Sequence, residues 1–118
     1  MRLLVAVIND REKLDEMLSG FIELGITGAT VVNTEGMGRL LSHEIPIFAG
    51  LQALISGSRA QNCMVLSVIP ASKVQGAIDL LQEVCGNLDD PATGIAFTVP
   101  VDAVVGLAPE LGTGGAPI

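Results

Sequence analysis

Apolar and polar residues follow the same order in each half of the chain, strand-like first, then helix-like, then strand-like again. The first half opens with an unbroken apolar run, Leu3–Ile8, which is typical of a buried strand. Apolar residues then recur three and four positions apart over Leu14–Ile22, and Asn9-Asp10 can supply the N-cap of this helix. Gly25 is a natural residue to end the helix, and the β-branched stretch Ala29–Thr34 predicts the second strand.

The second half repeats this order. Cys63–Ile69 is again apolar at nearly every position and predicts a strand. Ser72 can cap a helix whose apolar positions are spaced along Val74–Cys85, and Gly86 is placed to end it. The last predicted strand is Gly94–Val99, which Pro100 follows.

Two β-α-β units of similar length predict an α+β fold, the ferredoxin-like βαββαβ sandwich. It has one four-stranded antiparallel sheet with two helices on one face. We expect residues 1–105 to form one domain and residues 106–118, rich in Gly and Pro, to form a flexible C-terminal tail. Strands two and three are joined by a long segment, about residues 39–61, where a hairpin of roughly two to five residues would suffice. Such a length usually indicates function or disorder.

The apolar strands carry a second implication. A sheet with one face in water should alternate apolar and polar residues, but the first and third strands do not alternate. Two helices cover only one face, so an apolar set on the first strand would otherwise be exposed. The two candidate sets are Leu4, Ala6 and Ile8, or Leu3, Val5 and Val7. We therefore expect the uncovered face to be buried against other copies of the chain, as a homo-oligomer.

Charge and composition exclude several classes of protein. The 118-residue chain has a net charge of -7, six scattered basic residues and neither Tyr nor Trp, so nucleic-acid binding is not expected. No apolar run approaches the roughly 20 residues of a membrane span, and the opening run is too short for a signal peptide. We expect a cytoplasmic protein that is not membrane-inserted. A single histidine, His43, and two cysteines argue against a metal site and for buried thiols.

Three segments are candidates for function. The first, Gly36-Met37-Gly38-Arg39, ends the second strand, and its backbone amides and Arg side chain could approach phosphate oxygens. On composition alone, a flexible strand exit is the more common explanation of so short a motif. In the second segment, Asn87–Gly94, the carboxylates of Asp89 and Asp90 could hold Mg²⁺ or a hydroxylated ligand. An ordinary Asp-Pro turn is the more common explanation there.

The third segment is the long connection itself, which is apolar over Ile47–Ile55. Phe48, Leu51 and Leu54 could share one side of a short helix. They could form a docking surface for a partner protein, or they could pack onto their own or a neighbouring subunit, and periodicity does not separate the two. No Ser/His/Asp set or Cys/His pair is present to indicate an enzyme.

Taken together, these features resemble the P-II nitrogen-regulatory signalling proteins and their P-II-like relatives over Met1 to about Val104. The resemblance is carried by the opening strand, by Lys13-Leu14-Asp15, by Gly25-x-x-Gly28-x-Thr30 and by Thr34–Arg39. It implies a homotrimer that binds ATP or ADP between subunits. It also implies that the segment after Arg39 is a T-loop that contacts a transporter, an enzyme or a regulator.

The chain departs from typical members of the family at several positions. Leu40 stands where those members carry the Gln that helps to hold Mg²⁺ and 2-oxoglutarate, so that sensing mode is not implied here. Asp90–Ile95 lacks the phosphate-binding Lys, and Ala103–Leu107 lacks the basic residues that reach a neighbour's nucleotide. The absence of Tyr removes the uridylylation site of some members. The effector is therefore unassigned, with an adenine nucleotide as the first candidate.

We interpret the sequence as a non-classical, non-enzymatic P-II-like trimer that acts in signal transduction and nitrogen regulation. It would sense a small effector at subunit clefts and act on a partner through its long loop. The candidate effector residues are Thr30, Gly36, Gly38, Arg39, Asp90, Thr93 and Gly94. The candidate partner residues are His43, Phe48, Leu51 and Leu54. The alternatives are a ligand-free interaction trimer, a CutA-type metal-tolerance protein, or an ACT-type domain, which is normally attached to an enzyme.

Overall fold

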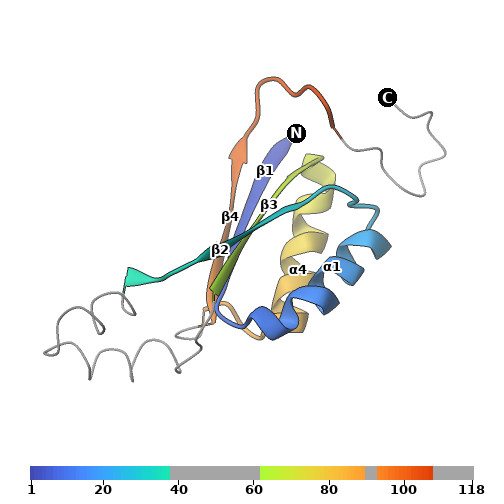
Figure 1. The fold of residues 1–118 in the computed structure, drawn as a ribbon. Coiled ribbons are helices and arrows are strands. Elements are labelled where there is room, and N and C mark those ends of the chain that lie inside the picture. Colours follow the sequence, from blue (N-terminus) through green and yellow to red (C-terminus); the bar gives the residue numbers. More distant parts are fainter. Residues whose placement is uncertain (38–61, 90–92, 108–118) are drawn as a thin grey trace, which may run out of the picture.

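The computed structural model describes residues 1–37, 62–89 and 93–107. In chain order, their elements are β1 (Arg2–Ile8), η1 (Arg11–Lys13), α1 (Leu14–Glu23), β2 (Thr30–Thr34), β3 (Asn62–Ile69), η3 (Ala71–Lys73), α4 (Val74–Cys85) and β4 (Gly94–Pro100). Each predicted strand and helix is present within about two residues of its expected bounds. Figure 1 shows α1 and α4 side by side against the same face of the sheet.

The sheet has the order β2-β3-β1-β4, and every neighbouring pair is antiparallel. The predicted ferredoxin-like α+β fold is therefore confirmed. β4 is an edge strand within the described residues, and its last residue, Pro100, lies opposite Arg2. Because proline cannot donate a backbone hydrogen bond, a position at the end of an edge strand disturbs the ladder least.

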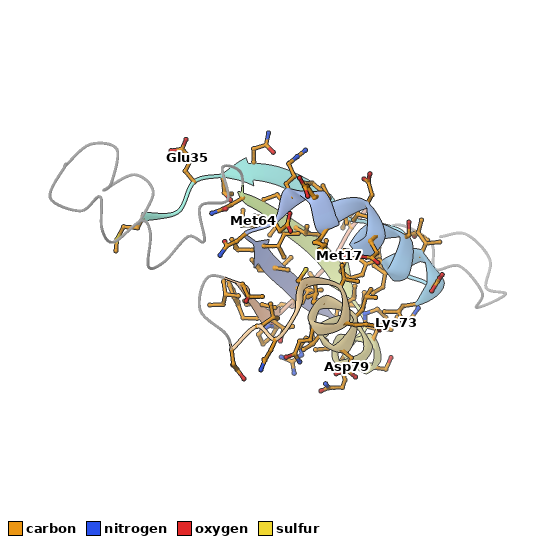
Figure 2. The ribbon with its side chains drawn as sticks, turned by 90° about the horizontal axis from the view of Figure 1, so that it is seen from below. Met17, Glu35, Met64, Lys73 and Asp79 are labelled. Atoms are coloured by element: carbon orange, nitrogen blue, oxygen red, sulfur yellow. The ribbon has the colours of Figure 1, made fainter. Side chains whose placement is uncertain are left out.

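The hydrophobic core lies between the sheet and the two helices. Alternate residues of β1 and β3 point into it and meet the apolar stripes of α1 and α4, as the helix spacing predicts. Met17 of α1, labelled in Figure 2, is fully buried in this layer. The largest members of the core are Phe21, Leu4, Ile8, Met17, Ile69, Leu81 and Val65. The helices approach each other closely at Gly20, where a Cβ atom would lie 2.6 Å from the Leu80 side chain.

The two helices begin differently. Asp10 caps the first, because its carboxylate accepts a hydrogen bond from the Glu12 amide at 3.0 Å. The expectation that Ser72 caps the second helix is wrong. Pro70 occupies the N-cap of η3, and Ser72 lies inside that turn, where its side chain makes no capping bond. The turn closes through the backbone instead, with the Lys73 amide donating to the Pro70 carbonyl at 3.0 Å.

This difference can be measured. We expect Asp10→Ala to lower the free energy of unfolding by about 1 kcal/mol, because the first turn loses its side-chain acceptor. Ser72→Ala is the matched control, since it removes an exposed hydroxyl from the equivalent turn of the other half without removing a cap. Urea unfolding of both variants checks the difference. Equal losses would contradict the assignment of the caps.

The sheet face opposite the helices carries a continuous set of apolar side chains, which we call the open face. The strand registers arrange it in three rows: Val32, Met64, Val7 and Ile95; Thr30, Leu66, Val5 and Phe97; and Val68, Leu3 and Val99. The second of the two sets predicted on β1 is therefore the uncovered one. Exposure is greatest on the two edge strands: Ile95 is 57%, Phe97 46% and Val99 43% exposed on β4, and Val32 is 39% exposed on β2. Ten of these eleven residues are apolar, which is unusual for a surface in water.

Candidate functional site

The candidate effector residues that the structure describes lie in two places. Gly36, Thr93 and Gly94 lie at the end of the sheet where β2 finishes and β4 begins. Thr30 lies in the middle row of the open face, opposite Leu66. Figure 2 shows Glu35 near one end of the molecule and Lys73, the last residue of η3, toward the other.

Even the residues at one end do not meet within a single chain. Gly36 follows the edge strand β2, whereas Gly94 begins the opposite edge strand β4. Two strands separate them, so the lateral distance is about 14 Å at the usual spacing of neighbouring strands. A ligand that touches both segments must span this width or be held by more than one copy of the chain.

Gly94 is required by the geometry of its strand. Its φ angle is +149°, and a Cβ atom at this position would lie 2.4 Å from the carbonyl oxygen of Val7. The preceding residue is also tied to β1, because the Asn9 amide donates to the Thr93 carbonyl at 3.4 Å. Gly94 thus lets the start of β4 approach the end of β1 closely.

The main pocket of the described residues lies at the other end, with a volume of about 420 Å³. Its walls come from the turn between α1 and β2, from the end of β3 and from the chain after β4. Thr30 is the candidate residue that lines it. Sequence reasoning did not assign Thr27 or Gly28 to a site, although both line this pocket and belong to the Gly25-x-x-Gly28-x-Thr30 motif.

The chain after β4 contributes more than expected. Gly106 and Leu107, the first residues of the expected tail, line the pocket beside Val104 and Val105. Gly106 has a φ angle of +85°, a turn conformation that favours glycine. The apolar residues just before this glycine, Val104 and Val105, could have indicated in the sequence that this part of the chain belongs to the domain, because such residues are atypical of a solvated tail.

The pocket wall is largely uncharged. Among the described residues that line it there is no Asp, Glu, Lys, Arg or His side chain, and the polar groups come from Thr27, Thr30 and the backbone, including the amino group of Met1. The side chains of such a wall suit a neutral or apolar part of a ligand.

The two thiols, Cys63 and Cys85, lie away from this pocket. Burial raises the pKa of the Cys63 thiol, and the positive charge of Arg11 offsets part of that rise. Burial is also the main cause that raises the pKa of Cys85, with a smaller contribution from Asp10. Both thiols therefore remain protonated at neutral pH, which is the unreactive form.

Over residues 1–37, 62–89 and 93–107, no three or more His, Cys, Asp or Glu side chains are grouped to hold a metal ion. No helix in these ranges is both long enough and apolar enough to span a bilayer. The remaining candidate residues lie outside the described ranges: Gly38, Arg39, Asp90, His43, Phe48, Leu51 and Leu54.

Comparison with known proteins gives one family. The family model described as "Nitrogen regulatory protein P-II" matches residues 1–110, which includes every element of the sheet and both helices. A search of curated proteins found no match.

Proposed function

The chain belongs to the nitrogen regulatory protein P-II family, and from this premise we propose that it is a homotrimeric regulator of nitrogen metabolism. It senses a small effector, with an adenine nucleotide as the first candidate, in clefts between subunits. It passes the bound state to a partner protein through the segment 39–61. Members of this family are regulatory signalling proteins rather than enzymes. We place the protein in the cytoplasm, with which its two unpaired thiols are compatible.

One observation carries the proposal: the pocket and the open face share residues. Leu3, Thr30, Leu66 and Val68 line the pocket and also belong to the open face. A second copy that packs on this face would therefore cover the rim of the pocket and complete its walls. Assembly and effector binding are coupled in such an arrangement, because the same apolar surface serves both.

The separation of the candidate residues supports the same conclusion. Thr30 lies at the pocket, whereas Gly36 and Gly94 lie at the far end of the sheet and at its two edges. A single chain does not bring them together. A neighbouring subunit could place its own Gly36–Arg39 segment beside the Thr30 pocket, and this would join the uncharged wall to a group that binds phosphate.

Calorimetric titration tests the proposal. We expect ATP, ADP or cyclic AMP to release heat with a stoichiometry of one ligand per chain. Thr30→Val keeps the side-chain shape, removes one hydroxyl from the pocket and should weaken that binding about tenfold. Thr98→Val, which changes the same residue type on β4 outside the pocket, is the control. No heat with any of the three nucleotides at millimolar concentration would sink nucleotide sensing and leave the family assignment intact.

A further inference from the structure

Ser67 is the one buried polar side chain in the described part of the chain, with only 3% of its surface exposed. It lies on β3 between Val65 and Ile69, which both face the core and are almost completely buried. A hydroxyl group in such a place is unfavourable unless it forms a hydrogen bond. Its partner therefore indicates what the residue does.

The partner is a backbone group far away in the sequence. The Ser67 hydroxyl donates to the carbonyl oxygen of Gly28 at 2.5 Å, across 39 positions of the chain. The ladder between β2 and β3 begins only at Thr30, opposite Leu66, so Gly28 precedes the first ladder pair. Ser67 thus supplies a bond where the sheet supplies none, and it attaches the turn before β2 to the centre of β3.

This turn is a wall of the 420 Å³ pocket. Thr27, Gly28, Ala29 and Thr30 line it in succession, and Leu66 and Val68 line it from β3 on either side of Ser67. Ser67 itself points to the opposite, core side of the strand. It therefore holds the wall from behind without touching the space that a ligand would occupy.

We propose that Ser67 is a positioning residue of the effector site. Its hydroxyl holds the Thr27–Thr30 wall in the conformation that binds the effector. This rests on the proposed function, since it assumes that the pocket receives part of the effector. Without the hydroxyl, the Gly28 carbonyl loses its donor and the wall moves to find another partner, such as water. Ligand binding would then have to restore the order of the wall, which weakens affinity.

The test compares Ser67→Ala with Cys63→Ala. Both residues lie on β3, face the core and are buried, and each variant removes one side-chain heavy atom. Cys63 does not line the pocket. We expect Ser67→Ala to weaken adenine-nucleotide binding about tenfold and to speed hydrogen exchange of the Thr27–Thr30 amides by a similar factor. We expect Cys63→Ala to change neither the affinity nor the exchange, even if it lowers the melting temperature as much as Ser67→Ala does.

A conservative variant completes the design. Ser67→Thr keeps the hydroxyl and suits a strand, so it should retain the exchange protection that Ser67→Ala loses. Ser67→Cys has a similar size but a weaker hydrogen-bond donor, so its exchange protection should lie between those of the Thr and Ala variants. If Ser67→Ala does not fold, Ser67→Cys takes its place in the comparison. The proposal is overturned if the Ser67 and Cys63 variants lose affinity and protection equally. Where the wild-type protein binds no adenine nucleotide, nucleotide sensing fails. The exchange comparison then decides on its own whether Ser67 holds the wall.

Discussion

Phe97→Glu should separate the proposed trimer into single chains that remain folded. Phe97 occupies the middle row of the open face, beside Val5 and near the exposed side chains of Ile95 and Val99. In a single chain Phe97 is already 46% exposed, so a carboxylate there costs little. In an assembly that covers the open face, the same carboxylate would be held among apolar groups without a partner.

The size of this effect follows from the desolvation of the charge. An unpaired buried charge costs about 3 kcal/mol or more, which weakens association by about 100-fold or more. Light scattering should show the mass falling from three chains to one chain of 12.2 kDa. Circular dichroism should show that the helices and strands remain.

Ile22→Glu provides the control for Phe97→Glu. Ile22 lies on α1, in the layer on the other side of the sheet, and is 56% exposed. Ile22→Glu adds the same charge at similar exposure but away from the open face, so its mass should stay equal to that of the wild-type protein. A wild-type mass of one chain at every concentration would contradict the trimer. Equal dissociation of the two variants would show that charge alone, and not the open face, decides assembly.

Gly94→Ala should lower the free energy of unfolding by about 3 kcal/mol, the largest effect that we expect from a single added methyl group. Two costs combine. The φ angle of +149° is essentially reserved for glycine, and the new Cβ atom would lie 2.4 Å from the Val7 carbonyl oxygen. The clashing atom belongs to the backbone of the central strand β1, so it cannot rotate away as the end of a side chain can.

Gly86→Ala separates these two costs. Gly86 also has a positive φ angle, +93°, but no atom lies within 4 Å of the position of an added Cβ. This variant should lose only the conformational part, about 1–2 kcal/mol, because φ +93° with ψ 177° is a region that essentially only glycine adopts. Urea unfolding of both variants at the same chain concentration gives the comparison. Equal losses would show that the close approach of β4 to β1 does not constrain Gly94.

The sequence predicted the fold well because its two periodicities have direct local causes. Residues three and four apart share a helix face, and this spacing placed Met17, Phe21 and Leu81 in the core before the helices were seen. Gly25 and Gly86 end their helices with positive φ angles, as their residue type allows. The Ser72 cap was wrong because Ser is common both at caps and within turns. The choice between them depended on the turn Ala71–Lys73, which precedes the helix, has the extended Pro70 at its N-cap and places Ser72 inside the turn.

The candidate site was less accessible to such reasoning. The family resemblance assigns Thr30, Gly36 and Gly94 to one expected effector site. The sheet, however, places Gly36 and Gly94 at its opposite edges. Thr27 and Gly28 lie in the same motif as Thr30, yet nothing in their spacing shows that they face a pocket. Its other walls begin at Ile69 and at Val104, far along the chain.

The sequence by itself determined the order of the elements and the apolar character of both sheet faces, because each depends on residue types within a short window. It also indicated the family, through motifs distributed along the chain. Only the tertiary structure decided that Leu3, Val5 and Val7 form the open face. The side chains of a strand point alternately to its two faces, and which set is left uncovered depends on the face that the helices cover. It also decided that Ser67 holds Gly28 across 39 positions, since a hydrogen bond of this kind exists only once two distant segments are brought together.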